Sequence, residues 1–277
     1  MPPHNTMLID SHVHLQHPSF DGNREALLNA ARQSGISGWI VPAVSKNCWP
    51  RIAELTANNR DCFGCYGIHP SQLSHTDCAN LTKNITPYLN SAVAIGEIGL
   101  DGACPDHHGQ VHLLRMQLAI ARSLNLPLML HLHKATAALI QVLRDERWNE
   151  MRGIVHGFTG SHETASQLLR LGMIISLGHR IVPDNSCRIR TMVQNLPDSS
   201  FVFETDAPQH DTSINNQNLP QLLRLHTVIK RASELRQEDP PTLIQESATT
   251  VCQIFPAIAH HLSVDTYYGT VVPKETV

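Results

Sequence analysis

Eight short apolar segments alternate with longer amphipathic ones along this chain, and this alternation limits its possible folds more than any other feature. The apolar segments span residues 7–10, 38–44, 63–69, 92–99, 127–132, 153–158, 173–178 and 201–206. Each is rich in Val, Ile or Leu, as expected of parallel strands that are covered on both faces. The pattern predicts an α/β protein with one parallel sheet.

The amphipathic segments predict helices. The clearest covers residues 107–124, where leucines recur at helical spacing. A second is expected over 161–171, with Ser161 as its N-cap. Two more follow the last strand, over 219–235 and 240–255.

A strand–helix unit repeated eight times is typical of a single (β/α)8 TIM barrel, here with an additional C-terminal helix. The alternative is an open doubly wound sheet, which usually carries a glycine-rich phosphate turn after its first strand. In this chain the first strand leads into residues 10–14, D-S-H-V-H, which contain no glycine. We expect one domain over residues 1–258 and a surface tail over 259–277.

Composition excludes several functional classes. With 24 acidic and 21 basic residues the net charge is -3, which argues against a repressor or a DNA-packaging protein. No apolar run is long enough to span a membrane, and no secretory signal is visible. We therefore expect a cytoplasmic protein, and nothing in the sequence indicates a protein partner. The seven cysteines, including the Cys62-x-x-Cys65 pair, are expected to be reduced, and this pair buried and structural.

Histidine is unusually frequent, with 18 residues, and several stand where a barrel places its active site, at the C-terminal ends of the strands. Imidazoles and carboxylates at these ends are His12, His14, His69, Glu97, His131, His133, His156, Glu204 and Asp206. One such residue alone is more often structural. Glu97 lies inside an apolar strand, however, and a buried carboxylate is costly unless it is paired or bound to metal.

The spacing of His12 and His14 predicts that both imidazoles face one cation, because residues i and i+2 of a strand point to the same side. Four histidines with two carboxylates exceed one tetrahedral site. Two cations that share a carboxylate would use them all, as in nucleases, phosphatases and amide hydrolases. Nitrogen and oxygen donors without thiolates suit Zn, Mn, Ni or, less strongly, Mg. We expect one or two divalent cations.

Five motifs follow one another in a specific order. They are D-S-H-V-H-L (10–15), G-I-H-P (67–70), G-E-I-G-L-D (96–101), V-H-G-F-T-G-S (155–161) and E-T-D-A-P (204–208). In this order they resemble the motifs of TatD-family metal-dependent hydrolases, members of the amidohydrolase superfamily. The resemblance extends from about residue 7 to residue 255. It implies a distorted TIM barrel, divalent cations and hydrolysis of ester bonds, with deoxyribonuclease and 3′ exonuclease activity in some members.

The resemblance also implies a role for each matching residue. It gives the first cation to His12 and His14 with Asp206 nearby, the second to His131 and His156, and the bridging position to Glu97. His69 is expected beside the substrate. Asp206 is either the base that takes a proton from the attacking water or a metal ligand only.

Three positions depart from the family pattern. An Arg is usual two residues after the His131 position, where this chain has His133. A neutral His lacks the fixed charge and planar fork of Arg, so the role of His133 at the substrate is open. Gly157 replaces a Cys, and Thr250 replaces an Asn.

These patterns favour a phosphodiesterase that acts on DNA ends. An amidohydrolase-type enzyme for a small amide, lactone or phosphoester is the alternative, and a non-catalytic metal-binding scaffold is a third. The complete set of candidate ligands weighs against the scaffold.

Overall fold

The computed structural model describes residues 7–183, 186–208 and 218–261. In them the predicted strands form one parallel sheet, hydrogen-bonded in sequence order from β1 to β8. The strands are β1 (Leu8–Asp10), β2 (Ile36–Pro42), β3 (Cys62–Tyr66), β4 (Ala92–Asp101), β5 (Leu128–His133), β6 (Gly153–Val155), β7 (Met173–Leu177) and β8 (Phe201–Phe203). Each predicted apolar segment contains or overlaps one of these strands, so the predicted sheet is confirmed.

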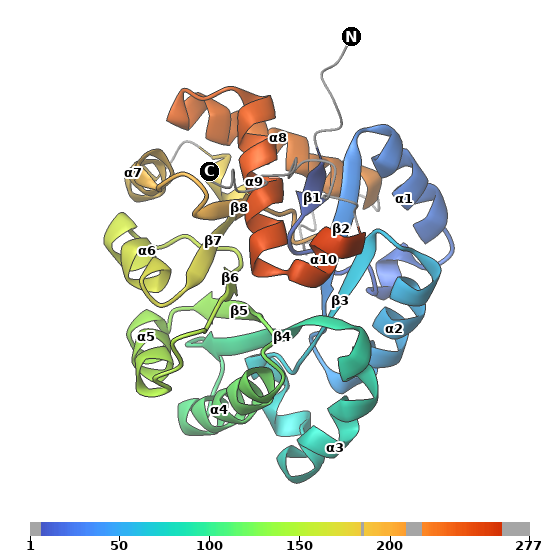
Figure 1. The fold of residues 1–277 in the computed structure, drawn as a ribbon, viewed down its shortest axis with the longest axis vertical. Coiled ribbons are helices and arrows are strands. Elements are labelled where there is room, and N and C mark those ends of the chain that lie inside the picture. The colour runs from blue at the N-terminus through green and yellow to red at the C-terminus, as the bar shows by residue number, and fades with distance from the viewer. Residues whose placement is uncertain (1–6, 184–185, 209–217, 262–277) are drawn as a thin grey trace, which may run out of the picture.

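Helices surround the sheet (Figure 1). They are α1 (Arg24–Gln33), α2 (Trp49–Asn58), α3 (Leu81–Ile85), α4 (His107–Ser123), α5 (Thr136–Asp145), α6 (His162–Leu169), α7 (Cys187–Asn195), α8 (Asn218–Arg236), α9 (Pro240–Ile254) and α10 (Pro256–His261). Short 3-10 helices, η1 to η6, lie at Pro18–Phe20, Lys46–Cys48, Pro70–His75, Cys78–Asn80, Thr86–Ser91 and His179–Ile181. The four helices predicted from the sequence correspond to α4, α6, α8 and α9.

Local side-chain chemistry fixes where several helices begin. Ser161 caps α6, because its hydroxyl accepts a hydrogen bond from the Thr164 N–H at 3.2 Å. Asp106 caps α4 in the same way through the Gly109 N–H at 2.9 Å. Two prolines open α9, where their missing N–H groups cost nothing.

Apolar side chains form two layers. The outer layer lies between the sheet and the surrounding helices. The inner layer fills one end of the barrel, where residues from all eight strands meet α9 and α10. Its members are Met7, Ile9, Ile40, Phe63, Cys65, Val93, Ala94, Met129, Ile154, Ile174, Val202, Ala248, Val251, Ile254, Phe255 and Ile258. We call this layer the apolar plug.

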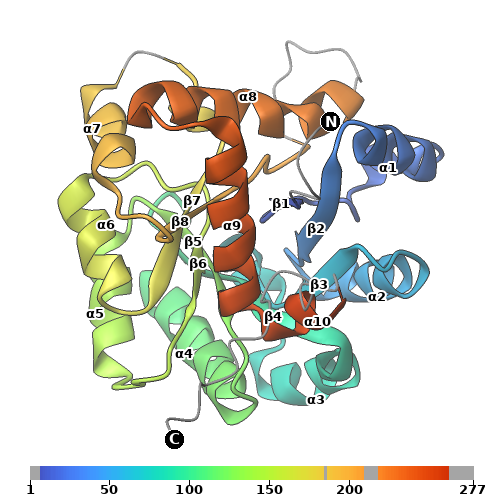
Figure 2. The ribbon, with the colours of Figure 1, turned by 45° about the horizontal axis from the view of Figure 1, so that its top comes forward.

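The barrel is distorted where β1 meets β8. Among the described residues these two strands share no ladder, and α9 packs against both of them instead (Figure 2). Beyond the strand ends three backbone bonds join the two segments: Ser11 N–H to Phe203 O at 2.9 Å, Asp206 N–H to His12 O at 2.9 Å and His14 N–H to Ala207 O at 2.7 Å. Closure at this point therefore depends on the loops that follow β1 and β8.

The C-terminal region differs in part from the sequence prediction. The expected boundary at residue 258 falls inside α10, a helix that the sequence did not predict, and Ile258 is fully buried in the apolar plug. The remainder of the expected tail, residues 262–277, lies outside the described residues. None of the described helices is long and apolar enough to cross a membrane. Cys62 and Cys65 are buried free thiols, as predicted.

Candidate metal centre

The candidate ligands come from the C-terminal ends of five strands. His12 and His14 follow β1, Glu97 lies in β4, His131 in β5, His156 after β6 and Asp206 after β8. Their side chains meet at one mouth of the barrel, opposite the apolar plug. The structure thus brings together every residue that the sequence placed on a cation.

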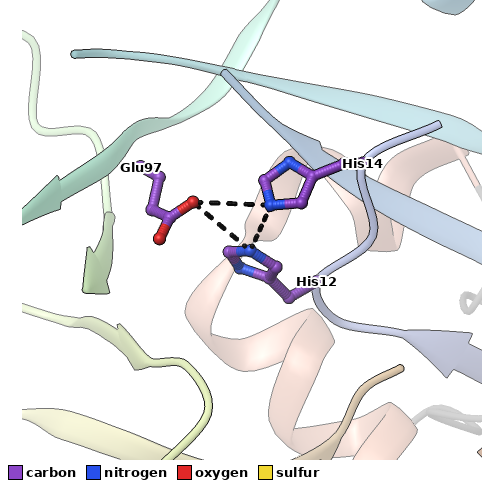
Figure 3. A group of neighbouring side chains, drawn as sticks. All are labelled: His12, His14 and Glu97. Atoms are coloured by element: carbon purple, nitrogen blue, oxygen red, sulfur yellow. Dashed lines mark hydrogen bonds and ion pairs between the residues drawn. The ribbon is translucent and has the colours of Figure 1, made fainter. Parts of the chain in front are cut away.

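One oxygen of Glu97 faces the first pair of histidines (Figure 3). Glu97 Oε2 lies 3.5 Å from His12 Nε2 and 3.6 Å from His14 Nε2, and these two nitrogens are 3.3 Å apart. Asp206 Oδ1 lies 3.7 Å from His12 Nε2 and 3.5 Å from His14 Nε2. Four donor atoms therefore surround one point.

The other oxygen of Glu97 faces the second pair. Glu97 Oε1 lies 2.8 Å from His156 Nε2 and 2.9 Å from His131 Nδ1, and these nitrogens are 3.1 Å apart. One carboxylate with an oxygen toward each imidazole pair has the geometry of a bridging ligand.

The chemistry of this cluster fits divalent cations. Three groups of its nitrogen and oxygen atoms, each within 4.8 Å of one another, offer metal ligands: His12–His14–Glu97, His12–His156–Asp206 and His69–Glu97–His131. Burial lowers the pKa of His12, which keeps its imidazole in the neutral form that ligates metal. Burial opposes the charge on Glu97, yet the neighbouring imidazoles, His156 first among them, hold the pKa of this carboxyl well below its usual range.

Hydrogen bonds behind the cluster orient its imidazoles. The Nδ1 atom of His14 lies 3.2 Å from the carbonyl oxygen of Pro42, the last residue of β2. A proton on Nδ1 satisfies this carbonyl and leaves the Nε2 lone pair toward Glu97.

His12 and His14 converge as predicted from the sequence, but the predicted cause of this convergence is wrong. β1 ends at Asp10, so the two histidines do not alternate along a strand. Bonds from the loops hold them instead: His12 O accepts from Asp206 N–H, and Val13 N–H donates to Ile40 O at 3.0 Å. The side chains converge because the loop is fixed to β2 and to the segment after β8.

Asp10, which was not among the site residues predicted from the sequence, supports this loop. Its side chain is fully buried; Oδ1 accepts from the N–H groups of His12 at 3.3 Å and Thr205 at 3.0 Å, and Oδ2 from the Thr205 hydroxyl at 2.6 Å. Burial raises the pKa of Asp10 to about 8 despite the bonds from Thr205. A charged residue inside an apolar strand was the available signal, as it was for Glu97.

Glu204 supports His156; the sequence placed it at the end of its strand but predicted no role for it. It is fully buried, Oε1 accepts the Gly157 N–H at 2.7 Å, and this oxygen lies 3.8 Å from His156 Nδ1. Gly157 has a φ of 57°, a left-handed conformation that side chains disfavour. At Gly178 a Cβ would lie 2.9 Å from Glu204 Oε1. Gly178 therefore makes room for this carboxylate, and Gly157 supplies the left-handed backbone at which its N–H meets Glu204 Oε1.

His69 approaches the cluster as a hydrogen-bond donor. Its Nδ1 accepts the Ser71 N–H at 3.1 Å, and burial lowers the pKa of the imidazole to about 4. The neutral ring then carries its proton on Nε2, which lies 3.5 Å from Glu97 Oε1. This tautomer suits contact with substrate better than metal ligation.

Two of the three residues that depart from the family pattern, His133 and Thr250, lie outside the cavity at the mouth. His133 Nδ1 lies 2.9 Å from Asp101 Oδ1, and nearly half of the His133 side chain is exposed. The Thr250 hydroxyl donates to the Glu246 carbonyl of its own helix at 2.8 Å. Neither residue lines the cavity at the mouth.

A cavity of about 1110 Å³ opens over the cluster. The candidate ligands His14, Glu97, His131, His156 and Asp206 form its floor, and His69, Arg51 and Arg180 are among its walls. A second hollow of about 700 Å³ lies along α1 and α2 and shares Gln16 and Arg51 with it. Together they exceed the space of a typical small-ligand site, about 300–1,000 Å³.

The chain is similar to known proteins over nearly its whole length. Residues 9–256 match the family described as TatD related DNase. An uncharacterized metal-dependent hydrolase of Escherichia coli K12, YjjV, is 33% identical, with 89% of this chain and 97% of YjjV covered. The 3'-5' ssDNA/RNA exonuclease TatD of Pantoea ananatis is 28% identical, with 73% and 79% covered. The crystal structure of E. coli YjjV superimposes with a TM-score of 0.81 at 32% identity and covers 90% of this chain and 98% of YjjV.

Proposed function

This chain belongs to the TatD related DNase family, and we propose that it is a divalent-metal-dependent hydrolase that cleaves phosphodiester bonds at the end of a DNA strand. The observation that carries the proposal is the position of Glu97, with one oxygen toward His12 and His14 and the other toward His131 and His156. Two imidazole pairs turned toward the two oxygens of one buried carboxylate form the donor set that a pair of cations requires.

We assign the first cation to His12, His14 and Asp206, the second to His131 and His156, and the bridge to Glu97. When bound, the cations supply the positive charge that acidifies water and stabilises negative charge on a phosphoryl oxygen.

Asp206 is the best candidate for the base. Its side chain is 35% exposed, against 3% for Glu97, so it can reach water in the cavity. Burial acts against its charge, but the hydrogen bond with His14 lowers its pKa to about 2 and keeps it ionised. Oδ1 faces the histidines, which leaves Oδ2 to take a proton from the attacking water.

His69 completes the machinery on the substrate side. Its Nε2–H can donate a hydrogen bond to a phosphate oxygen and stabilise the charge that develops there.

The space and charge at the mouth favour a strand end over a long duplex. The hollow along α1 and α2 gives an extended strand a path away from the mouth. The net charge of -3 opposes wrapping of duplex DNA but allows one flexible end to enter. We place the activity in the cytoplasm, a location supported by the free state of all seven cysteines.

End-labelled single-stranded DNA tests the proposal. Protein treated with EDTA should be inactive, and addition of Mn²⁺, Zn²⁺, Mg²⁺ or Ni²⁺ in turn should restore cleavage with at least one of them. For a 3′ exonuclease, a 3′-labelled strand releases labelled mononucleotide first, whereas a 5′-labelled strand shortens progressively. Full activity in protein shown to be metal-free by elemental analysis would contradict the metal mechanism. Cleavage of small esters or lactones but never of DNA would favour the amidohydrolase alternative, and metal binding without turnover of either would favour the scaffold.

A further inference from the structure

We propose that Arg180, in the turn after β7, is a phosphate-binding residue of the substrate cavity and supplies the guanidinium that the position of His133 lacks. The proposal rests on the proposed function, because it names the group that holds the phosphodiester backbone of that substrate. Among the described strands, β2 and β7 are those whose C-terminal ends contribute neither a candidate ligand nor His69, and Arg180 follows β7.

His133 is held away from this task. Its Nδ1 bonds to Asp101 Oδ1, and that oxygen also accepts the Ala103 N–H at 2.8 Å. The backbone of Asp101 is fixed in turn, because its N–H donates to Gln110 Oε1 at 2.9 Å. A rigid carboxylate thus keeps the His133 ring at the rim, outside the cavity lining.

Arg180 stands on a fixed backbone and presents a free end. Ile181, the next residue, is buried and anchors the 3-10 helix η6, with Ile181 N–H bonded to Gly178 O at 3.1 Å and Val182 N–H to His179 O at 3.0 Å. The Arg180 side chain is exposed and lines the same cavity as His14, His156 and Asp206.

The charges around the cavity single out Arg180. Among the described lining residues the fixed cations are Arg51 and Arg180. Arg51 is engaged by Asp21, which also binds Arg24, whereas no contact from another described residue holds the Arg180 guanidinium. A guanidinium in the cavity wall matches two phosphate oxygens with two parallel N–H groups.

Arg180 should therefore select substrates by charge. A phosphodiester gains a charge-assisted bond from it, and a neutral carboxylic ester of similar size gains none. The residue should lower the KM for a nucleic acid strand and leave hydrolysis of a neutral ester unchanged.

Arg180→Gln tests this role, with Arg188→Gln as the matched control. Arg188 is an exposed arginine on neighbouring α7 that does not line the cavity, so its loss removes the same charge from the same region. In metal-reconstituted protein we expect Arg180→Gln to lower kcat/KM on a short single-stranded oligonucleotide about 10-fold, mainly through KM. The kcat/KM of Arg188→Gln on the oligonucleotide, and that of Arg180→Gln on p-nitrophenyl acetate, should stay within about two-fold of the wild-type values. The kcat/KM of Arg180→Lys on the oligonucleotide should lie between those of the wild type and Arg180→Gln, since Lys keeps the charge but loses the parallel N–H donors of the planar guanidinium.

Two binding measurements do not depend on turnover. Fluorescence anisotropy with a phosphorothioate thymidine oligonucleotide, which resists cleavage, should show the same loss of about 10-fold for Arg180→Gln. The slope of log affinity against log salt should become shallower by about 0.7, the value for one phosphate contact on a single strand.

The outcomes separate the two proposals. If the wild type cleaves no phosphodiester with any of the four metals, the proposed function fails, and the anisotropy series still decides whether Arg180 binds phosphate. If the wild type cleaves DNA but Arg180→Gln and Arg188→Gln behave alike in binding and salt dependence, the Arg180 proposal is overturned. An equal loss on oligonucleotide and neutral ester would also overturn it.

Discussion

The two ends of the barrel are built from the same eight strands, yet they are held together by different forces. At the mouth, histidines and carboxylates crowd around Glu97, and Asp10 and Glu204 hold the loops behind them. At the opposite end, apolar side chains of every strand pack against α9 and α10.

If the proposed function holds, one end is organised for binding and the other for stability. Burial of apolar surface at the plug is favourable in the free protein. The mouth gathers buried charge that is costly until a cation balances it. Because the plug supplies stability, the protein can fold although no cation balances the buried charge at the mouth. Substitutions at the two ends should therefore have separable effects.

The largest expected effect is on stability, at the plug. Phe255 is fully buried there, and Phe255→Ala should lower the free energy of unfolding by about 3–5 kcal/mol through lost burial and a new cavity. Denaturant unfolding measures the change. Leu124→Ala, which removes an apolar side chain that is 46% exposed, is the control and should cost far less. The folded fraction of Phe255→Ala should bind metal like the wild type; loss of metal binding would show that the two ends are coupled.

A somewhat smaller effect, on activity, is expected at the mouth. Glu97→Gln removes the charge shared by both imidazole pairs and should lower kcat/KM by about 10²–10³-fold, or about 2.7–4 kcal/mol. Added metal should raise the Tm of the wild type and of Phe255→Ala but not of Glu97→Gln, because binding stabilises only a protein that has the site. A normal metal-induced rise in Tm for Glu97→Gln would contradict the bridging role.

Residues that hold the ligands in place should affect metal binding less than the ligands themselves. Glu204→Gln keeps the shape of the side chain and weakens its hold on Gly157 and His156, so metal affinity should fall about 10–100-fold. Isothermal titration with the restoring metal measures this change. Glu150→Gln, an exposed carboxylate after α5, should leave the affinity unchanged. Equal metal affinities for Glu204→Gln and Glu150→Gln would show that Glu204 only packs against its neighbours.

The smallest effect tests backbone conformation alone. Gly157→Ala places a Cβ no closer than 3.7 Å to Glu204 Oε1, so no clash arises, but its φ of 57° should cost about 1 kcal/mol of stability. Gly157→Asn should cost less, since Asn tolerates left-handed backbone better. Thermal unfolding of both variants gives the comparison. An Ala variant as stable as the wild type would show that the left-handed conformation is not required.

Much of the fold and of the ligand set could be read from local pattern. Strands covered on both faces are apolar throughout, and eight such apolar segments indicated the positions of the eight strands. Parallel strands in sequence order then place residues such as Glu97 and His131 at one end of the sheet, whatever the details of packing. The sequence missed α10, because it is short and follows α9 after one residue.

The sequence by itself determined the barrel, the end at which the chemistry gathers and the residues able to hold cations, because these depend on periodicity and strand direction, which are local properties. Only the tertiary structure decided which oxygen of Glu97 faces which histidine pair, that Asp101 holds His133 at the rim, and that Arg180 lines the cavity. Several of the residues involved, such as His12, His14 and Arg180, lie in turns and loops beyond the strand ends. There the direction of a side chain depends on hydrogen bonds from residues far away in the chain, such as those that join His12 and His14 to Asp206 and Ala207.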